Sequence, residues 1–192
     1  MANTQTFTVR RARPADVLRM MPLLNKYAEE GEILPRSQND VFDSVRSWAV
    51  AEAENTRIVG VGALVIISQE LAEVRSLVID PDYHRQGLGR RIVELLLAEA
   101  QEFDIARVFA LTRKPNFFLQ LGFRLTRLEK LPAKVRRDCV FCPIFHACDE
   151  VAMIINTKDL PPAKPMPEIV VGKNGMVNLP KIGQKEGAKS ND

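Results

Sequence analysis

Two glycines stand where an apolar segment gives way to a helical pattern. Leu71–Ile79 has the composition of a strand, and Gly87 and Gly89 follow it after a short polar turn. Glycine has no Cβ, so its backbone can approach a ligand closely. The first turn of a helix carries unpaired N–H groups and the positive end of the helix dipole, which attract anions. The turn therefore predicts a cradle for a pyrophosphate, although glycines also serve as plain turn residues in many α/β domains.

The commonest nucleotide motifs are absent from the chain. It contains neither the Gly-x-Gly-x-x-Gly of dinucleotide-binding folds nor the Gly-Lys-Ser/Thr of phosphate-binding loops. A dinucleotide or P-loop site is therefore disfavoured.

Composition indicates a soluble globular protein. The chain has 192 residues, of which 46% are hydrophobic and 27% charged, enough for one domain and a tail. The net charge is +3 and the Lys and Arg residues are spread out, so a small anionic substrate fits at least as well as a nucleic acid, and we expect no nucleic-acid partner. The longest apolar run, Val59–Ile67, is too short to cross a membrane, and the start of the chain lacks an apolar signal core. We therefore expect no membrane association and a cytoplasmic location.

The elements that must hold the cradle follow from periodicity and turn residues. We predict a strand at 7–13, a helix from Pro14 to about Glu30 and a second short helix ending near Arg46. The remaining predictions are strands at 47–52, 57–67, 71–79, 107–112, 123–128 and 150–156, and helices at 89–103 and 116–121. The helix at 89–103 has an apolar stripe, which consists of Ile92, Val93, Leu96, Leu97 and Ala100. This order predicts an α+β (α/β) domain over residues 1–156, built on one central mixed sheet. The Pro-, Lys- and Gly-rich residues 157–192 are predicted to form a flexible tail.

With these elements in place, the chain resembles the GNAT superfamily of N-acetyltransferases. The segment His84-Arg-Gln-Gly-Leu-Gly89 fills the acetyl-CoA motif of that family, with His84 where Gln or Arg is usual. Asn116–Phe123 is similar to a later family motif, and the resemblance covers roughly residues 7–156. It implies the GNAT fold, a mostly antiparallel sheet with flanking helices, and acetyl-CoA as co-substrate. The residues that it assigns to the cofactor are Leu77, Val78, Ile79, His84, Arg85, Gln86, Gly87, Leu88, Gly89, Arg90 and Phe118.

A closer resemblance is to the short, stand-alone N-acetylglutamate synthases, which lack an amino-acid kinase domain. The segments that carry it are Arg10–Val17, Glu30–Ser37, Leu71–Val78, Arg107–Arg113 and Leu131–Cys139. It implies transfer of acetyl from acetyl-CoA to the α-amine of L-glutamate, the first step of arginine biosynthesis. It also leaves room for a homodimer, since GNAT enzymes often pair.

Acetyl transfer to an amine needs a proton acceptor, stabilisation of the thioester oxygen and a leaving thiol. Glu73 matches the position where many GNAT enzymes carry a general base, but it could equally pair with Arg75 on the same strand face. Phe118 stands where many family members have a Tyr that protonates the leaving group. The resemblance implies that a backbone N–H of Leu77–Ile79 is the oxyanion donor, as is usual in the family, and that the strand splays from its neighbour there and leaves N–H groups free.

An acceptor with two carboxylates needs cationic side chains around it. The resemblance favours a set of residues from three segments, which are Arg36, Arg75, Ser76, Lys134 and Arg136. Arg113 and Arg137 are further candidates by residue type. The alternative for each one is a solvated position on a basic face.

All three cysteines fall in one segment. Cys139, Cys142 and Cys148, with His146 as a fourth ligand, have a spacing that could form a tetrahedral zinc site. Three reduced structural thiols are the alternative in a cytosolic protein.

Two other functions remain open at this point. One is a GNAT enzyme for a different amine, such as a peptide N-terminus, a lysine or a small molecule. The other is a CoA-binding regulatory module without catalysis, for which the missing Tyr leaves room and against which Glu73 argues.

Overall fold

The computed structural model describes residues 7–54, 56–142, 144–161, 170–171 and 177–178. The chain forms two compact units, Met1–Pro162 and Ala163–Asp192. In the first unit, residues just past the predicted domain end still pack on the domain. The Thr157 hydroxyl donates to the Ile105 carbonyl at 2.6 Å, and the Gln101 amide donates to the Thr157 carbonyl at 3.0 Å. In the second unit the described residues are β8 (Val170–Val171) and β9 (Val177–Asn178), which pair antiparallel. Most of the predicted flexible tail lies outside the described residues.

A seven-stranded mixed sheet forms the centre of the first unit, as predicted. Its order is β1-β2-β3-β4-β5-β7-β6, and every neighbouring pair is antiparallel except β4 and β5. The strands are β1 (Phe7–Arg11), β2 (Trp48–Ala53), β3 (Ile58–Ser68), β4 (Leu71–Ile79), β5 (Arg107–Thr112), β6 (Arg124–Leu125) and β7 (Val151–Asn156).

The parallel pair of strands separates early. Leu71–Glu73 of β4 pair with Arg107–Phe109 of β5, and beyond Glu73 β4 pairs only with β3. The expected splay is therefore confirmed, and it begins well before Leu77. Along the diverging stretch, one edge of β4 has no neighbouring strand to accept its backbone hydrogen bonds.

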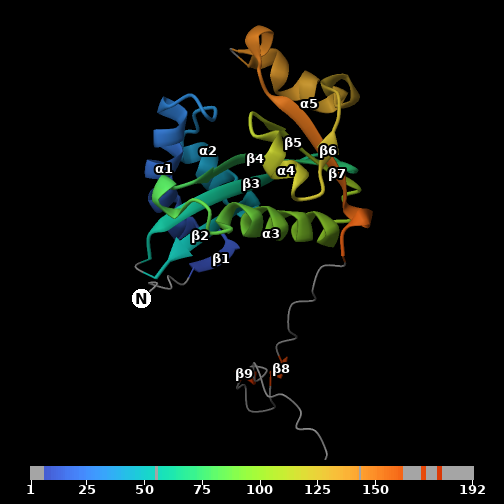
Figure 1. Ribbon diagram of the computed structural model, residues 1–192. Coiled ribbons are helices and arrows are strands. Elements are labelled where there is room, and N and C mark those ends of the chain that lie inside the picture. Colours follow the sequence, from blue (N-terminus) through green and yellow to red (C-terminus); the bar gives the residue numbers. More distant parts are fainter. Residues whose placement is uncertain (1–6, 55, 143, 162–169, 172–176, 179–192) are drawn as a thin grey trace, which may run out of the picture. The chain divides into compact units, whose positions relative to one another are not determined.

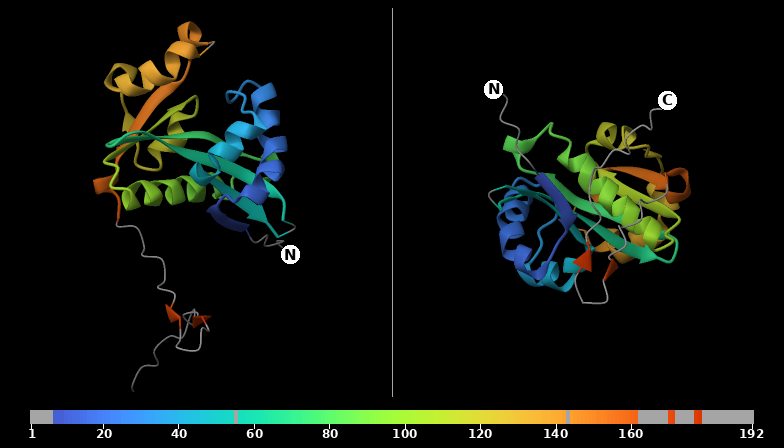
Figure 2. Two further views of the ribbon diagram at one scale, coloured as in Figure 1. Left: turned by 180° about the vertical axis from the view of Figure 1, so that it is seen from behind. Right: turned by 90° about the horizontal axis from the view of Figure 1, so that it is seen from below.

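Helices cover both faces of the sheet (Figure 1). Helices α1 (Val17–Glu29) and α2 (Gln38–Asp43) lie on one face and α3 (Leu88–Glu102) on the other, as the view from below in Figure 2 shows. Ser37 begins α2 with a capping box, in which its side chain and that of Asp40 each accept a hydrogen bond from the other residue's backbone N–H. This cap fixes the position of the residues just before it.

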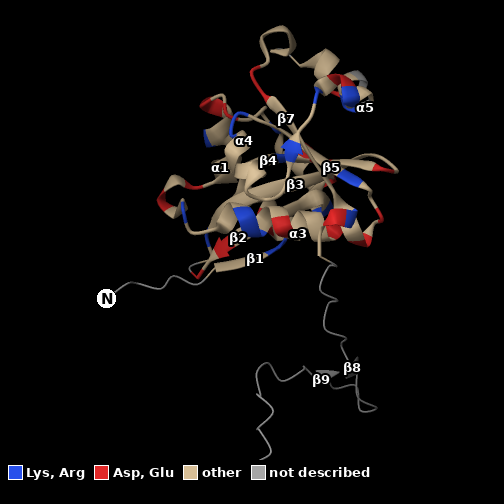
Figure 3. Ribbon diagram, turned by 45° about the vertical axis from the view of Figure 1, so that its right-hand side comes forward, with Lys and Arg blue, Asp and Glu red and all other residues tan. Residues whose placement is uncertain are grey.

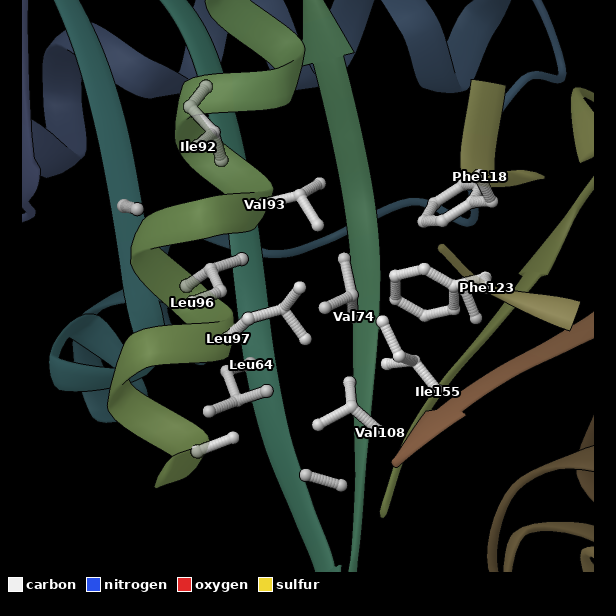
Figure 4. Close-up of a cluster of buried hydrophobic side chains, with 14 of the residues drawn as sticks. Leu64, Val74, Ile92, Val93, Leu96, Leu97, Val108, Phe118, Phe123 and Ile155 are labelled. Atoms are coloured by element: carbon white, nitrogen blue, oxygen red, sulfur yellow. The ribbon is translucent and has the colours of Figure 1, made fainter. Parts of the chain in front are cut away.

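The face of α3 that meets the sheet is the predicted apolar stripe. Its members Ile92, Val93, Leu96, Leu97 and Ala100 are all buried, and Figure 4 shows the first four directed toward the strands. Burying each of the larger side chains stabilises the fold by about 1.5–3 kcal/mol. The stripe thereby fixes the start of α3 beside the end of β4.

Two glycines of β3 make this close packing possible. A Cβ at Gly60 would lie 2.6 Å from Ile79 Cδ1, and one at Gly62 would lie 2.9 Å from Ile92 Cγ2. A larger residue at either position would require the Ile79 or the Ile92 side chain to move.

The segment between β6 and β7 differs most from prediction. The strand expected at 123–128 is only two residues long, and α4 (Pro115–Leu119) precedes it. A short helix, α5 (Pro132–Arg137), and 3₁₀ turns at Leu128–Lys130, Cys139–Phe141 and Phe145–Ala147 then follow where no element was expected. Leu131, which is fully buried, anchors this segment to Phe109 and Ile154 on the sheet.

Candidate active site

A cleft of about 1190 Å³ lies where β4 parts from β5. Its walls are the end of β4, the turn before α3, the loop after α1, the end of β5, α4 and part of α5. A second hollow of about 550 Å³ contains none of the predicted site residues and is lined by Arg107, Arg124, Leu125, Thr126, Arg127, Lys130 and Ile154. The larger cleft is therefore the candidate site.

The predicted cradle forms one end of the cleft. Gly87 is the N-cap of α3 and has φ +76°, a left-handed conformation that glycine adopts without strain. It has no side chain to cap the helix, so the first-turn N–H groups face the cleft without an intrahelical acceptor. Figure 3 shows Lys and Arg residues, in blue, at the start of α3. Their positive charge adds to that of the helix dipole.

All but one of the residues predicted for the cofactor line the cleft. They are Leu77, Val78, Ile79, His84, Arg85, Gly87, Leu88, Gly89, Arg90 and Phe118. Gln86 is exposed and is not among the lining residues. Phe118 is buried and packs edge-on against Phe123 at 5.1 Å between ring centroids. It offers an apolar wall and no proton donor.

A bulge interrupts β4 beside the cradle. Val61 pairs with Val78 and Ala63 with Arg75, so β4 contains one residue more than β3 over this stretch. Ser76, within the bulge, has φ +52°, an uncommon conformation for a residue with a side chain. Such strained backbone often occurs at ligand sites. Nothing in the sequence indicated it, because the residue is not a glycine.

His84, which replaces the usual Gln or Arg, is directed back to the strand. Its Nε2 lies 2.8 Å from the Ile79 carbonyl oxygen, which also accepts a hydrogen bond from the Tyr27 hydroxyl at 2.5 Å. His84 and Tyr27 therefore hold the end of β4 beside α1. Sequence reasoning had assigned no role to Tyr27.

Glu73 lies in an ion-pair network at the other end of the cleft. Its side chain is buried, and Oε2 accepts a hydrogen bond from Lys134 Nζ at 2.9 Å. Lys134 also donates to Asp138 at 2.8 Å, and Arg75 lies 3.9 Å from Glu73 and 3.6 Å from Asp138. Burial alone would lower the pKa of Lys134, but the two carboxylates outweigh burial and raise that pKa above its usual value. The pairing of Glu73 with Arg75 thus exists, but Lys134 is the nearer partner.

Arg36 has no hydrogen bond or ion pair among the residues that the structure describes. It follows α1, lines the cleft, and its Nε is fully buried without a partner. Burial lowers the pKa of its guanidinium and the nearby charge of Arg75 adds to this effect, although an arginine stays charged at neutral pH. A buried donor without an acceptor costs about 1–3 kcal/mol, which an anionic ligand would offset.

The residues around the start of β7 complete this end of the cleft. Arg113, a further candidate for the acceptor, instead donates from Nε to Asp149 at 2.7 Å and from Nη1 to the Gly31 carbonyl at 2.9 Å. The neighbouring Glu150 lines the cleft, is half-buried, and has no hydrogen bond or ion pair to any described residue. Burial raises the pKa of the Glu150 carboxyl, and Arg113 opposes this only in part. No pattern in the sequence pointed to Glu150, because a single acidic residue at the start of a strand is usually solvated.

The remaining predicted acceptor residues divide into two groups. Arg75, Ser76 and Lys134 line the cleft together with Arg36. Arg136 lies in α5, but its side chain is outside the described residues.

The predicted zinc site finds no support. Within the described part of the chain, no group of three or more His, Cys, Asp or Glu residues is placed to hold a metal ion. Cys139 is buried, whereas Cys148 and His146 are exposed, and the His146 ring packs against Phe145 at 5.3 Å between centroids. Two 3₁₀ turns separate these residues, and their spacing along the chain does not become a set of ligands in space. All three free thiols nevertheless line the cleft.

No helix in the described part of the chain is both long enough and apolar enough to cross a membrane.

Comparison with known proteins agrees with this geometry. The model of the acetyltransferase (GNAT) family matches residues 17–123. An uncharacterized N-acetyltransferase of Chlorobaculum tepidum is 36% identical over 146 residues, which are 76% of this chain and 94% of that protein. An amino-acid acetyltransferase of Mycobacterium tuberculosis is 36% identical over 127 residues, 65% of this chain and 71% of that protein.

Among solved structures, N-acetylglutamate synthase from Neisseria gonorrhoeae, complexed with coenzyme A and N-acetyl-glutamate, superposes with a TM-score of 0.71. The match covers 79% of this chain and 35% of that one at 21% identity, and it shows that the two share a fold. The family model covers more than half of the chain, and the Chlorobaculum tepidum relative matches along almost its whole length. The chain therefore belongs to the acetyltransferase (GNAT) family and is an acetyl-CoA-dependent N-acetyltransferase.

Proposed function

We propose that the protein transfers acetyl from acetyl-CoA to the α-amino group of an acidic amino acid, L-glutamate, and so forms N-acetylglutamate. The observation that carries this proposal is Arg36, which lines the cleft near Arg75 and Glu73 and whose buried Nε has no described partner. A planar guanidinium suits a carboxylate, which it can bind through two parallel hydrogen bonds. The relatives named as amino-acid acetyltransferases support the same class of acceptor.

Backbone groups of the cleft would bind the acetyl donor. The first turn of α3 would bind the pyrophosphate through its N–H groups, and the open edge of β4 would hold the pantetheine and the thioester oxygen. Phe118 cannot protonate the departing sulfur, so the thiolate must leave without that help. This is chemically reasonable because a thiol has a pKa of about 8.5 and its anion is a tolerable leaving group.

Two cationic side chains would bind the amino-acid acceptor. Lys134 is already bound by Glu73 and Asp138, whereas Arg36 and Arg75 have donors to spare. We propose that Arg36 binds one carboxylate of glutamate and that Arg75, beside the bulge at Ser76, binds the other. Glu73, which the family resemblance predicts as the general base, would have that role only if its pair with Lys134 gave way to the acceptor.

Turnover with a panel of amino acids tests the proposal. The protein is supplied with acetyl-CoA and each of the twenty amino acids, and both the released thiol and the acetylated product are measured. We expect the highest kcat/KM with L-glutamate. Turnover confined to peptide or lysine side-chain amines would overturn the proposed acceptor, and binding of CoA without turnover of any amine would favour a regulatory module.

Such a product would place the enzyme at the first step of arginine biosynthesis, as the resemblance implies. A cytoplasmic location and a homodimer stay predictions.

A further inference from the structure

One carboxylate in the cleft takes no part in the interactions described for the site. Glu150 lines the cleft and is half-buried, yet it has neither a hydrogen bond nor an ion pair with any described residue. We propose that Glu150, and not Glu73, accepts the proton from the amine of the acceptor. This inference rests on the proposed function only in requiring that the acceptor be an amine.

The fold places Glu150 opposite β4. It directly precedes Val151, the first residue of β7, which pairs with Thr112 at the end of β5. Because β5 and β4 diverge beyond Glu73, the two carboxylates stand on different walls of one cleft. The charged groups that face Glu150 are Glu73 on β4, Lys134 on α5 and Arg113 after β5, and Asp149 precedes it in its own segment.

Acidic residues in and beside this end of the cleft differ in how far a cationic partner already neutralises their charge. Glu73 accepts a hydrogen bond from Lys134 at 2.9 Å, and Asp149 accepts one from Arg113 at 2.7 Å. A carboxylate stabilised in this way is a weak base, because protonation would destroy its ion pair. Glu150 has no such partner, and burial raises the pKa of its carboxyl toward the neutral range in which a general base works best.

The reaction balances with Glu150 in this role. At neutral pH the α-amino group of a free amino acid is largely protonated, because its pKa is higher than that of a peptide N-terminus, which is about 8. The carboxylate of Glu150 takes one proton from the ammonium, and the freed lone pair attacks the thioester carbon. The C–S bond then breaks, and the second N–H proton ends on the departing sulfur. The products are an amide, the CoA thiol and one proton, which Glu150 releases to water.

The pH dependence of kcat/KM for the amine in Glu150→Gln tests this role. We expect a loss of about 10²–10⁴-fold at pH 7, the usual contribution of a general base. We also expect the acid limb of the wild-type profile to be replaced by a steady tenfold rise per pH unit, because only pre-formed neutral amine reacts. The dissociation constant for CoA should be unchanged, which also shows that the variant is folded.

Two further variants make the result decisive. Glu150→Asp keeps a carboxylate and should keep the acid limb with a lower kcat, whereas Glu129→Gln, an exposed carboxylate in the same cleft, should match the wild type. An acid limb that persists in Glu150→Gln, or a change confined to KM, would refute the proposal. So would an acid limb that disappears only in Glu73→Gln. If the wild type turns over an amine other than glutamate, the proposed acceptor fails, but the same series with that amine still tests Glu150.

Discussion

The buried pair of Lys134 and Glu73 makes a quantitative prediction about stability. Nζ and Oε2 are 2.9 Å apart, and the two residues are 7% and 3% exposed. Lys134→Met removes the cation and leaves the Glu73 carboxylate buried without its partner, which typically costs 3–5 kcal/mol. Asp138 is more exposed and can be hydrated instead. At about 2–4 °C per kcal/mol for a domain of this size, the melting temperature should fall by about 6–20 °C.

Urea unfolding followed by circular dichroism measures this loss directly. Glu73→Gln added to Lys134→Met should recover much of it, because the uncompensated charge is then absent. Since pairing raises the pKa of Lys134, its contribution is fully present below the unfolded value of about 10.4 and is lost only as the pH rises through the folded value. The exposed Lys26→Met serves as the control, with an expected change within about 0.5 kcal/mol. A loss below about 1 kcal/mol in Lys134→Met would refute the reasoning.

Three further predictions concern the acceptor, the packing and the acid range. Arg36→Ala should raise KM for glutamate about 10- to 100-fold with CoA binding unchanged, since a hydrogen bond to a charged group contributes about 1.5–3 kcal/mol; steady-state kinetics and calorimetry check this, and an unchanged KM would count against the assignment. Gly60→Ala places a Cβ 2.6 Å from Ile79 Cδ1 and should destabilise the domain by about 1–3 kcal/mol in thermal unfolding, whereas a neutral result would show that the Ile79 side chain can move aside at no cost. The hydrogen-bonded Arg10 lowers the pKa of Asp16, so the stability this pair contributes is present above the unfolded value of about 3.9 and is lost as the pH falls through the lower folded value. Acid unfolding of Asp16→Asn beside the wild type should show the two stabilities converging below about pH 4, and parallel curves would exclude this linkage.

The sequence was most informative where a single periodicity decides the structure. The stripe of Ile92, Val93 and Leu96 has helical spacing, so both the helix and its buried face were predicted correctly. The strand from Leu71 to Ile79 was equally clear. Its partner strands could be inferred only through the family resemblance, because pairing depends on residues far apart in the chain.

Other parts of the site depend on tertiary contacts that leave no local pattern. The short helix α5 is held by Leu131 on the sheet and by the ion pairs of Lys134, neither of which shows a periodicity. The positive φ of Ser76 has no sequence signature, and neither has the unpaired state of Glu150. For the cysteines, spacing along the chain described how close the thiols could come but not the direction in which each one points.

The bulge at Ser76 also determines how the chain tolerates changes of length. In a regular strand Val74 and Val78 would point to the same face, yet Val74 packs in the core beneath α3 and Val78 in the core beneath α1. The extra residue shifts the alternation by one position between them. Deleting Ser76 would therefore restore regular pairing and leave the following side chains, Leu77 and Ile79 among them, on the faces that they occupy now. The packing of the core does not require the extra residue, and what its deletion would remove is the distorted backbone of β4 that lines the cleft.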